Sequence, residues 1–103
     1  MIEMKTEVLS PVAVVIRVSG EVDMNTSPKL QDILKSAAAQ GMKDVTIELS
    51  GVTYMDSSGI ATLVEMLQAM TAKKGKLVLK AMAPQVKSVF EIAHLTEVFE
   101  IVD

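Results

Sequence analysis

The 103 residues suffice for one folded domain, and we expect a single domain over residues 1–103. Half of the residues are apolar and 22% are charged, which is the balance of a folded protein and not of a disordered chain. The absence of cysteine excludes a disulfide framework and a thiolate metal site, and the cytoplasm is the expected compartment. A net charge of −3, with one tyrosine and two phenylalanines, argues against direct binding to nucleic acid.

No stretch of the chain is apolar enough to predict contact with a membrane. The longest apolar run, residues 12–16, falls far short of the roughly 20 residues that a membrane-spanning helix needs. Glu3 and Glu7 stand where a secretory signal peptide would be apolar. We therefore expect neither a membrane segment nor an export signal.

The first 41 residues predict a hairpin followed by a helix. Residues 4–8 alternate weakly, residues 10–11 suit a turn, and residues 12–18 form a nearly continuous β-branched run typical of a central strand. At residues 27–28 a serine can cap a helix and a proline suits its first turn. An apolar stripe at helical spacing then continues almost to Gly41, through Leu30, Ile33, Leu34 and Ala37.

The middle of the chain predicts a strand and a second helix. Residues 45–49 alternate between apolar and polar side chains, which indicates a strand that ends at the polar turn of residues 50–51. Beyond residue 59 the apolar side chains recur at helical spacing: Ile60, Leu63, Val64, Leu67 and Met70. Two lysines and a glycine at residues 73–75 are a common helix ending.

The remaining residues complete an α/β pattern. Residues 76–80 predict a short strand, Pro84 begins a third helix, and residues 98–102 predict a last strand. The order is therefore ββαβαβαβ. Strands that alternate with helices indicate right-handed crossovers and a mostly parallel sheet, and the opening hairpin adds an antiparallel pair, so we expect a mixed sheet.

Two of the predicted loops share the position where α/β domains bind their ligands and partners. Residues 20–26 and residues 54–59 each follow a strand and precede a helix, so they should meet outside the carboxyl ends of the strands. That would bring Asp23 near Ser57. A hydroxyl at the start of a helix faces the positive end of its dipole. We therefore expect Ser57 to be able to cap the helix when unmodified and to hold a phosphate without refolding.

The segments GEVDMNTSPKL, LSGVTYMDSSGI and AMAPQVKSVFEIAHL resemble the STAS family, in particular its stand-alone bacterial anti-sigma factor antagonists. The resemblance covers almost the whole chain, and DSSG together with the GEVD loop is more specific than DSSG alone. It implies one STAS domain with a mixed sheet of four to five strands and three or four helices. It also implies that the first serine after the aspartate, Ser57, is phosphorylated by an anti-sigma factor that is also a serine kinase.

The resemblance implies a binding switch and not an enzyme. The unphosphorylated protein would bind the anti-sigma factor kinase and release the sigma factor, and a PP2C-type phosphatase would restore binding after phosphorylation. The added charge would lie beside Asp23 and Asp56 and would oppose binding. We expect no cofactor, no metal and a free monomer. The expected contact surface comprises Asp23, Met24, Asn25, Thr26, Met55, Asp56, Ser57, Ser58 and Gly59.

Simpler structural roles are open for several of these residues. Ser58 can be a cap or a support, and Asp23 and Asp56 suit turns or caps as well as a functional site. Gly59 is expected to allow close approach of the backbone. The methionines of the two loops, Met24 and Met55, are expected either to fill the core or to give an adaptable contact surface.

Three other functional classes compete with the switch. An enzyme would use Ser57 as a nucleophile, but the G-x-S-x-G elbow is absent and the sequence places no base. A receiver domain would carry a phospho-aspartate at Asp56, but the acidic pair after a first strand is missing. Within the family, a non-switching scaffold or a transporter-associated module is the remaining alternative. Ser57 and the stand-alone length favour the partner-switching role.

Overall fold

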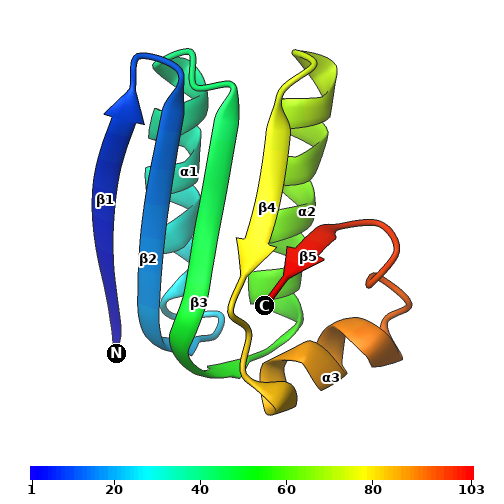
Figure 1. Cartoon of the computed structure of the whole chain (residues 1–103). Coiled ribbons are helices and arrows are strands. Elements are labelled where there is room, and N and C mark those ends of the chain that lie inside the picture. The colour runs from blue at the N-terminus through cyan, green and yellow to red at the C-terminus, as the bar shows by residue number, and fades with distance from the viewer.

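The computed structural model describes all residues, 1–103, and its elements follow the predicted order ββαβαβαβ (Figure 1). The strands are β1 (Ile2–Ser10), β2 (Ala13–Val22), β3 (Asp44–Met55), β4 (Lys76–Lys80) and β5 (Glu100–Val102). The helices are α1 (Ser27–Ala39), α2 (Ser57–Ala72) and α3 (Pro84–Ile92). The α/β class and the order of elements expected from the sequence are confirmed.

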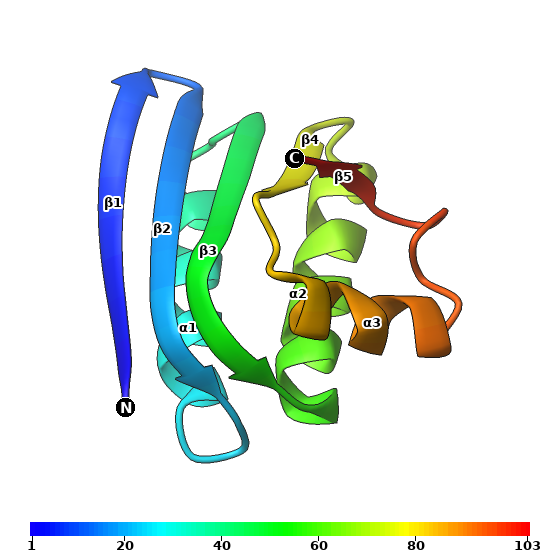
Figure 2. The same cartoon turned by 60° about the horizontal axis from the view of Figure 1, so that its bottom comes forward.

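The strands form one mixed sheet in the order β1-β2-β3-β4-β5. β1 pairs with β2 antiparallel, whereas the other three pairings are parallel. Because the strand order advances in one direction, successive right-handed crossovers place α1 and α2 on the same face of the sheet, as Figure 1 shows. α3 lies toward the carboxyl ends of β3 and β4 (Figures 1 and 2).

The hydrophobic core lies between the sheet and the helices. Alternate residues of the central strands point toward α1 and α2 and are almost fully buried: Val14, Ile16, Val18, Val45, Ile47 and Leu49. The helices meet them with Leu30, Leu34, Leu63, Met66 and Met70. Phe90 of α3 packs edge-on against Phe99, with ring centroids 5.5 Å apart. The opposite side of the central strands carries polar residues such as Arg17 and Glu48, so the alternation expected for residues 45–49 is confirmed.

β2 and β3 are longer than the sequence suggests, and the predicted turn at residues 50–51 is wrong. In the parallel register Ser19 pairs with Gly51 and Gly20 with Val52, so each strand supports the continuation of the other. The register shifts on both sides of this stretch explain why the simple alternation breaks there. A Cβ on Gly51 would come within 2.6 Å of Cβ of Ser19, so glycine permits this close approach of the strands.

Two element ends also differ from the prediction. α1 begins at Ser27, which is buried inside the first turn, and its N-cap residue is Thr26 and not Ser27. β5 begins at Glu100, because the backbone N–H groups of Val98 and Phe99 both donate to the carbonyl of Leu95 in a turn. The expected strand start at residue 98 is therefore two residues early.

Candidate functional site

The two loops singled out in the sequence begin side by side at one edge of the sheet. Val22 and Met55 are paired residues at the ends of β2 and β3, and the backbone N–H of Asp56 donates to the carbonyl of Val22 at 3.1 Å. Asp23 and Asp56 therefore follow directly on paired residues of neighbouring strands. Figure 2 shows the loop after β2 and the β3–α2 connection at the same end of the domain.

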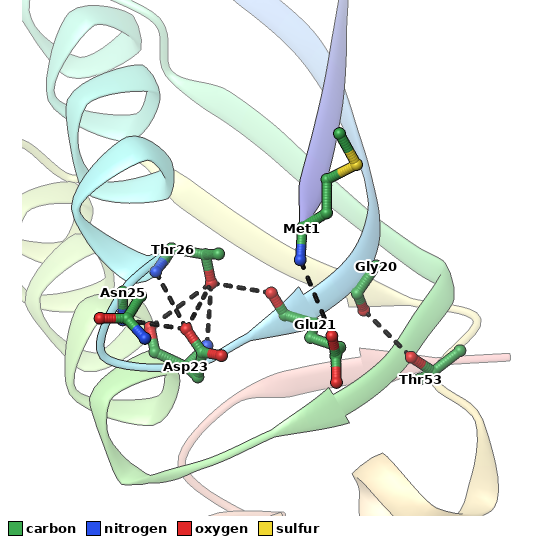
Figure 3. A network of polar contacts seen from close by, with 7 residues as sticks. All are labelled: Met1, Gly20, Glu21, Asp23, Asn25, Thr26 and Thr53. Carbon is green, nitrogen blue, oxygen red and sulfur yellow. Dashed lines mark hydrogen bonds and ion pairs between the residues drawn. The ribbon is translucent and has the colours of Figure 1, made fainter.

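The first loop is closed by its own hydrogen bonds (Figure 3). Oδ1 of Asp23 accepts from the backbone N–H groups of Asn25 at 2.9 Å and Thr26 at 3.0 Å. The hydroxyl of Thr26 accepts from the backbone N–H of Asp23 at 2.9 Å and donates to the carbonyl of Glu21 at 2.7 Å. With Asp23 and Thr26 so engaged, Met24 lies on the surface, with 74% of it exposed.

Asp56 is the N-cap residue of α2. Its Oδ1 accepts the backbone N–H of Ser58 at 2.9 Å and the hydroxyl of Ser58 at 2.6 Å. The pKa of Asp56 is lowered, first by the hydroxyl of Ser58 and then by the backbone N–H groups of Ser58 and Gly59, against an opposing effect of burial. The carboxylate is therefore ionised at neutral pH, at the positive end of the helix dipole.

Ser57 is the first residue of α2, and its side chain is exposed and makes no hydrogen bond within the chain. The expectation that Ser57 caps the helix is wrong, because Asp56 occupies the cap position and satisfies the N–H of Ser58. Ser58 has the supporting role expected as one alternative, since its hydroxyl holds the carboxylate of Asp56. The hydroxyl of Ser57 is thus exposed and has no hydrogen-bond partner within the chain.

Met55 and Gly59 lie beneath this surface. Met55 is only 3% exposed and belongs to the core, so the expectation that its side chain offers contact surface is wrong. Gly59 is also buried, and a Cβ there would come within 2.7 Å of Cγ1 of Val22 and 2.8 Å of Cγ of Met55. The close approach expected for Gly59 is confirmed, and both residues support the site from below.

The structure adds exposed neighbours that the sequence reasoning did not assign to the site. Tyr54 pairs with Glu21 across β2 and β3, and it is half exposed directly before Met55. Alternation along β3 was the available signal, because a buried Met55 requires Tyr54 to face outward. Met24 and Tyr54 are thus the exposed apolar and aromatic side chains of the two loop regions.

Other kinds of site find little support in the structure. His94 is exposed just after α3, with a φ of 58°. Nowhere do three or more metal-ligating side chains come together. No helix has the length and apolar character needed to cross a membrane.

Comparisons with known proteins agree with this geometry. The family model of the STAS domain matches residues 3–103. An anti-sigma-B factor antagonist of Staphylococcus aureus is 29% identical over 86 residues, which cover 84% of this chain and 80% of that relative.

Two solved structures have the same fold. SpoIIAA, an anti-sigma factor antagonist solved in its unphosphorylated form, gives a TM-score of 0.78 at 22% identity, over 98% of this chain and 88% of that chain. The Bacillus cell fate determinant SpoIIAA in its phosphorylated form gives 0.77 at 22% identity, over 98% of this chain and 92% of that chain.

Proposed function

Because this chain belongs to the STAS domain family, we propose that it is an anti-sigma factor antagonist whose partner binding is switched off by phosphorylation of Ser57. The relatives named above support the first part of the proposal. The observation that carries the second part is the free hydroxyl of Ser57, exposed at the start of α2 while Asp56 and Ser58 satisfy each other beside it.

The unphosphorylated surface suits a protein partner. Met24 and Tyr54 supply exposed apolar and aromatic area, and the hydroxyl of Ser57 can enter a contact without carrying charge. In the proposed active state this surface binds an anti-sigma factor that is also a serine kinase, and the sigma factor is released.

Phosphorylation changes the charge of this surface and not its fold. A phosphoserine adds about −1.5 to −2 charges next to Asp56, and a partner that accepted the neutral serine would have to desolvate this anion. A ten-fold loss of affinity corresponds to only about 1.4 kcal/mol, so electrostatic and steric effects are sufficient. The helix dipole at the start of α2 tolerates the phosphate. The similar TM-scores to unphosphorylated and phosphorylated SpoIIAA support a fold that accommodates both states.

The remaining steps of the cycle need other proteins. The kinase binds ATP and its metal and transfers the γ-phosphoryl group to the hydroxyl of Ser57, releasing ADP. A PP2C-type phosphatase removes the phosphate from Ser57 in the cytoplasm. This chain contributes the hydroxyl, its placement and the contact surface. It needs no cofactor of its own for these roles and works as a binding protein and not as an enzyme.

Mass spectrometry tests the modification site. The protein is incubated with Mg-ATP and a lysate of its source organism, beside Ser57→Ala and Ser58→Ala as matched controls. We expect one phosphate on the wild type and on Ser58→Ala, and none on Ser57→Ala. Phosphate on Ser58 would reassign the modified hydroxyl. A complete lack of phosphate, with the kinase shown to be active, would favour a non-switching scaffold, and labelling of Asp56 would identify a receiver.

A further inference from the structure

β1 leaves a long edge of the sheet without a partner. It is nine residues long and first in the sheet order, so only β2 pairs with it. In Figure 1 it forms the outer border of the sheet, with no element beyond it. Sheet edges of this length are usually shortened, covered or kept apart by charge, because they can pair with another chain.

The hydrogen-bond pattern shows which residues face outward. The N–H of Glu21 donates to the carbonyl of Met1 at 3.0 Å, and β1 pairs with β2 in regular antiparallel register from Ile2 to Val8. In such a ladder alternate residues direct their backbone groups to the partner strand. The odd-numbered residues of β1 therefore bond to β2, whereas Met4, Thr6 and Val8 present their N–H and carbonyl groups outward.

The side chains of this edge are incompletely paired within the chain. Lys5 stands directly opposite Arg17, a like charge, and takes part in no ion pair, whereas Glu7 pairs with Arg17 at 2.7 Å. Val8 and Leu9 are about 60% exposed. A groove of about 240 Å³ opens beside Val8, lined by Ile33 of α1 and other largely apolar residues.

We propose that a second copy of this chain docks antiparallel along β1, with the two-fold axis at Thr6. Thr6 then pairs with Thr6 of the second copy, and Met4 lies opposite Val8 of the second copy, next to the apolar groove. Lys5 lies opposite Glu7 of the second copy on both sides of the axis. This pairing gives Lys5 the carboxylate neighbour that it lacks within its own chain, since Glu7 already pairs with Arg17 of the same chain at 2.7 Å.

Charge distinguishes this register from its neighbours. An axis at Lys5 would place the two lysines directly opposite each other, and an axis at Glu7 would do the same with two glutamates. An axis at Met4 would leave Val8 and Leu9 outside the paired region. Only the axis at Thr6 combines opposite charges with pairing along the whole strand.

The dimer leaves the candidate switch site accessible. β1 is separated from the start of α2 by β2 and β3, so pairing along β1 does not cover Ser57. The proposal departs from the monomer expected from the sequence. It is also independent of the proposed function, since phosphorylation of Ser57 and pairing along β1 can each fail alone.

Charge reversal at Lys5 and Glu7 tests the register. Sedimentation velocity on the wild type over a concentration series should show a monomer–dimer equilibrium. Lys5→Glu and Glu7→Lys should each weaken dimerisation roughly ten-fold, because each places like charges opposite each other twice. The double variant Lys5→Glu/Glu7→Lys should restore dimerisation, because opposite charges then face each other again on both sides of the axis.

Thr6→Pro tests the backbone pairing. The N–H of Thr6 points away from β2, so proline removes a donor from the dimer and not from the ladder of the monomer. We expect Thr6→Pro to abolish dimerisation with an unchanged circular dichroism spectrum, whereas Thr6→Val should still dimerise. A wild type that stays monomeric up to millimolar concentration would overturn the proposal. A dimer unaffected by both Lys5→Glu and Thr6→Pro would also overturn it.

Discussion

The hydroxyl of Ser58 donates to Oδ1 of Asp56 at 2.6 Å, and the same oxygen accepts the backbone N–H of Ser58 at 2.9 Å. The two residues thereby fix the start of α2 and leave the hydroxyl of Ser57, between them in sequence, without an internal partner. Ser58 supports the start of the helix, and Ser57 is the proposed phosphorylation site. This division has measurable consequences for stability, ionisation and binding.

Removal of the cap at Asp56 should destabilise the domain. Asp56→Ala loses the acceptor of the Ser58 N–H, which typically lowers the free energy of unfolding by about 1 kcal/mol. Asp56→Asn, which keeps a capping oxygen, should cost much less. Urea unfolding followed by circular dichroism measures both. Asp32→Ala, at an exposed aspartate of α1, is the matched control, and an equal loss in Asp56→Ala and Asp32→Ala would contradict the capping role.

The ionisation of Asp56 should respond to Ser58. The hydroxyl of Ser58 is the largest cause of the lowered pKa of Asp56, so Ser58→Ala should raise that pKa toward the ordinary value of about 3.9. Carbon-detected NMR titration of the side-chain carboxyl measures the shift. An unchanged pKa of Asp56 in Ser58→Ala would mean that the backbone N–H groups alone lower this pKa.

The same pKa sets a pH dependence of stability. The pKa of Asp56 is lower in the folded than in the unfolded state, so its stabilising contribution is full above about pH 4 and is lost as the pH falls through the folded pKa. The difference in free energy of unfolding between the wild type and Asp56→Ala should therefore shrink on acidification below about pH 4. A constant difference between the two proteins down to about pH 2 would contradict this assignment.

Gly59 should not accept a side chain. The added Cβ of Gly59→Ala would lie 2.7 Å from Cγ1 of Val22 and 2.8 Å from Cγ of Met55, and the resulting overpacking should cost about 1–3 kcal/mol of unfolding free energy. Ser57→Ala, two residues earlier at an exposed position, should stay within about 0.5 kcal/mol of the wild type. Equal stability of the two variants would show that the packing beneath the site can shift.

Met24 should matter for binding and not for stability. Its side chain is exposed at the tip of the first loop, and the loop is closed by Asp23 and Thr26 without it. Met24→Ser should therefore weaken binding to the partner kinase several-fold and leave the unfolding midpoint unchanged. Calorimetric titration and urea unfolding measure the two effects. Undiminished binding would place the contact surface elsewhere.

The sequence was sufficient to predict the order of helices and strands, because hydrophobic periodicity and glycines mark these elements clearly. It was also sufficient to predict that the loops of residues 20–26 and 54–59 lie at the same end of the sheet. It could not identify the cap of α2, since Asp56, Ser57 and Ser58 are three consecutive residues that can all cap a helix. Which of them does so depends on where the backbone leaves the extended conformation after Met55. That point is set by the pairing of Val22 with Met55 across the sheet.

Burial at the end of β3 was equally hard to predict. Ser50 and Gly51 are typical turn residues, so the sequence did not predict that β3 continues through them. The register shifts near Ser19 and Gly51 also interrupt the alternation of apolar and polar side chains along β3. Without a continuous period, the inward direction of Met55 and the outward direction of Tyr54 could not be assigned. Met55 is therefore a core residue and Tyr54 an exposed one, which the sequence pattern alone did not indicate.

The affinity of the purified partner kinase for the two states of Ser57 tests the central claim most directly. Isothermal titration is made with the unphosphorylated protein, the Ser57-phosphorylated protein, Ser57→Ala and Ser57→Asp. We predict that the wild type and Ser57→Ala bind alike, that phosphorylation weakens binding ten-fold or more, equivalent to at least about 1.4 kcal/mol, and that Ser57→Asp lies between them. Equal affinity of the phosphorylated and unphosphorylated proteins would contradict the switch.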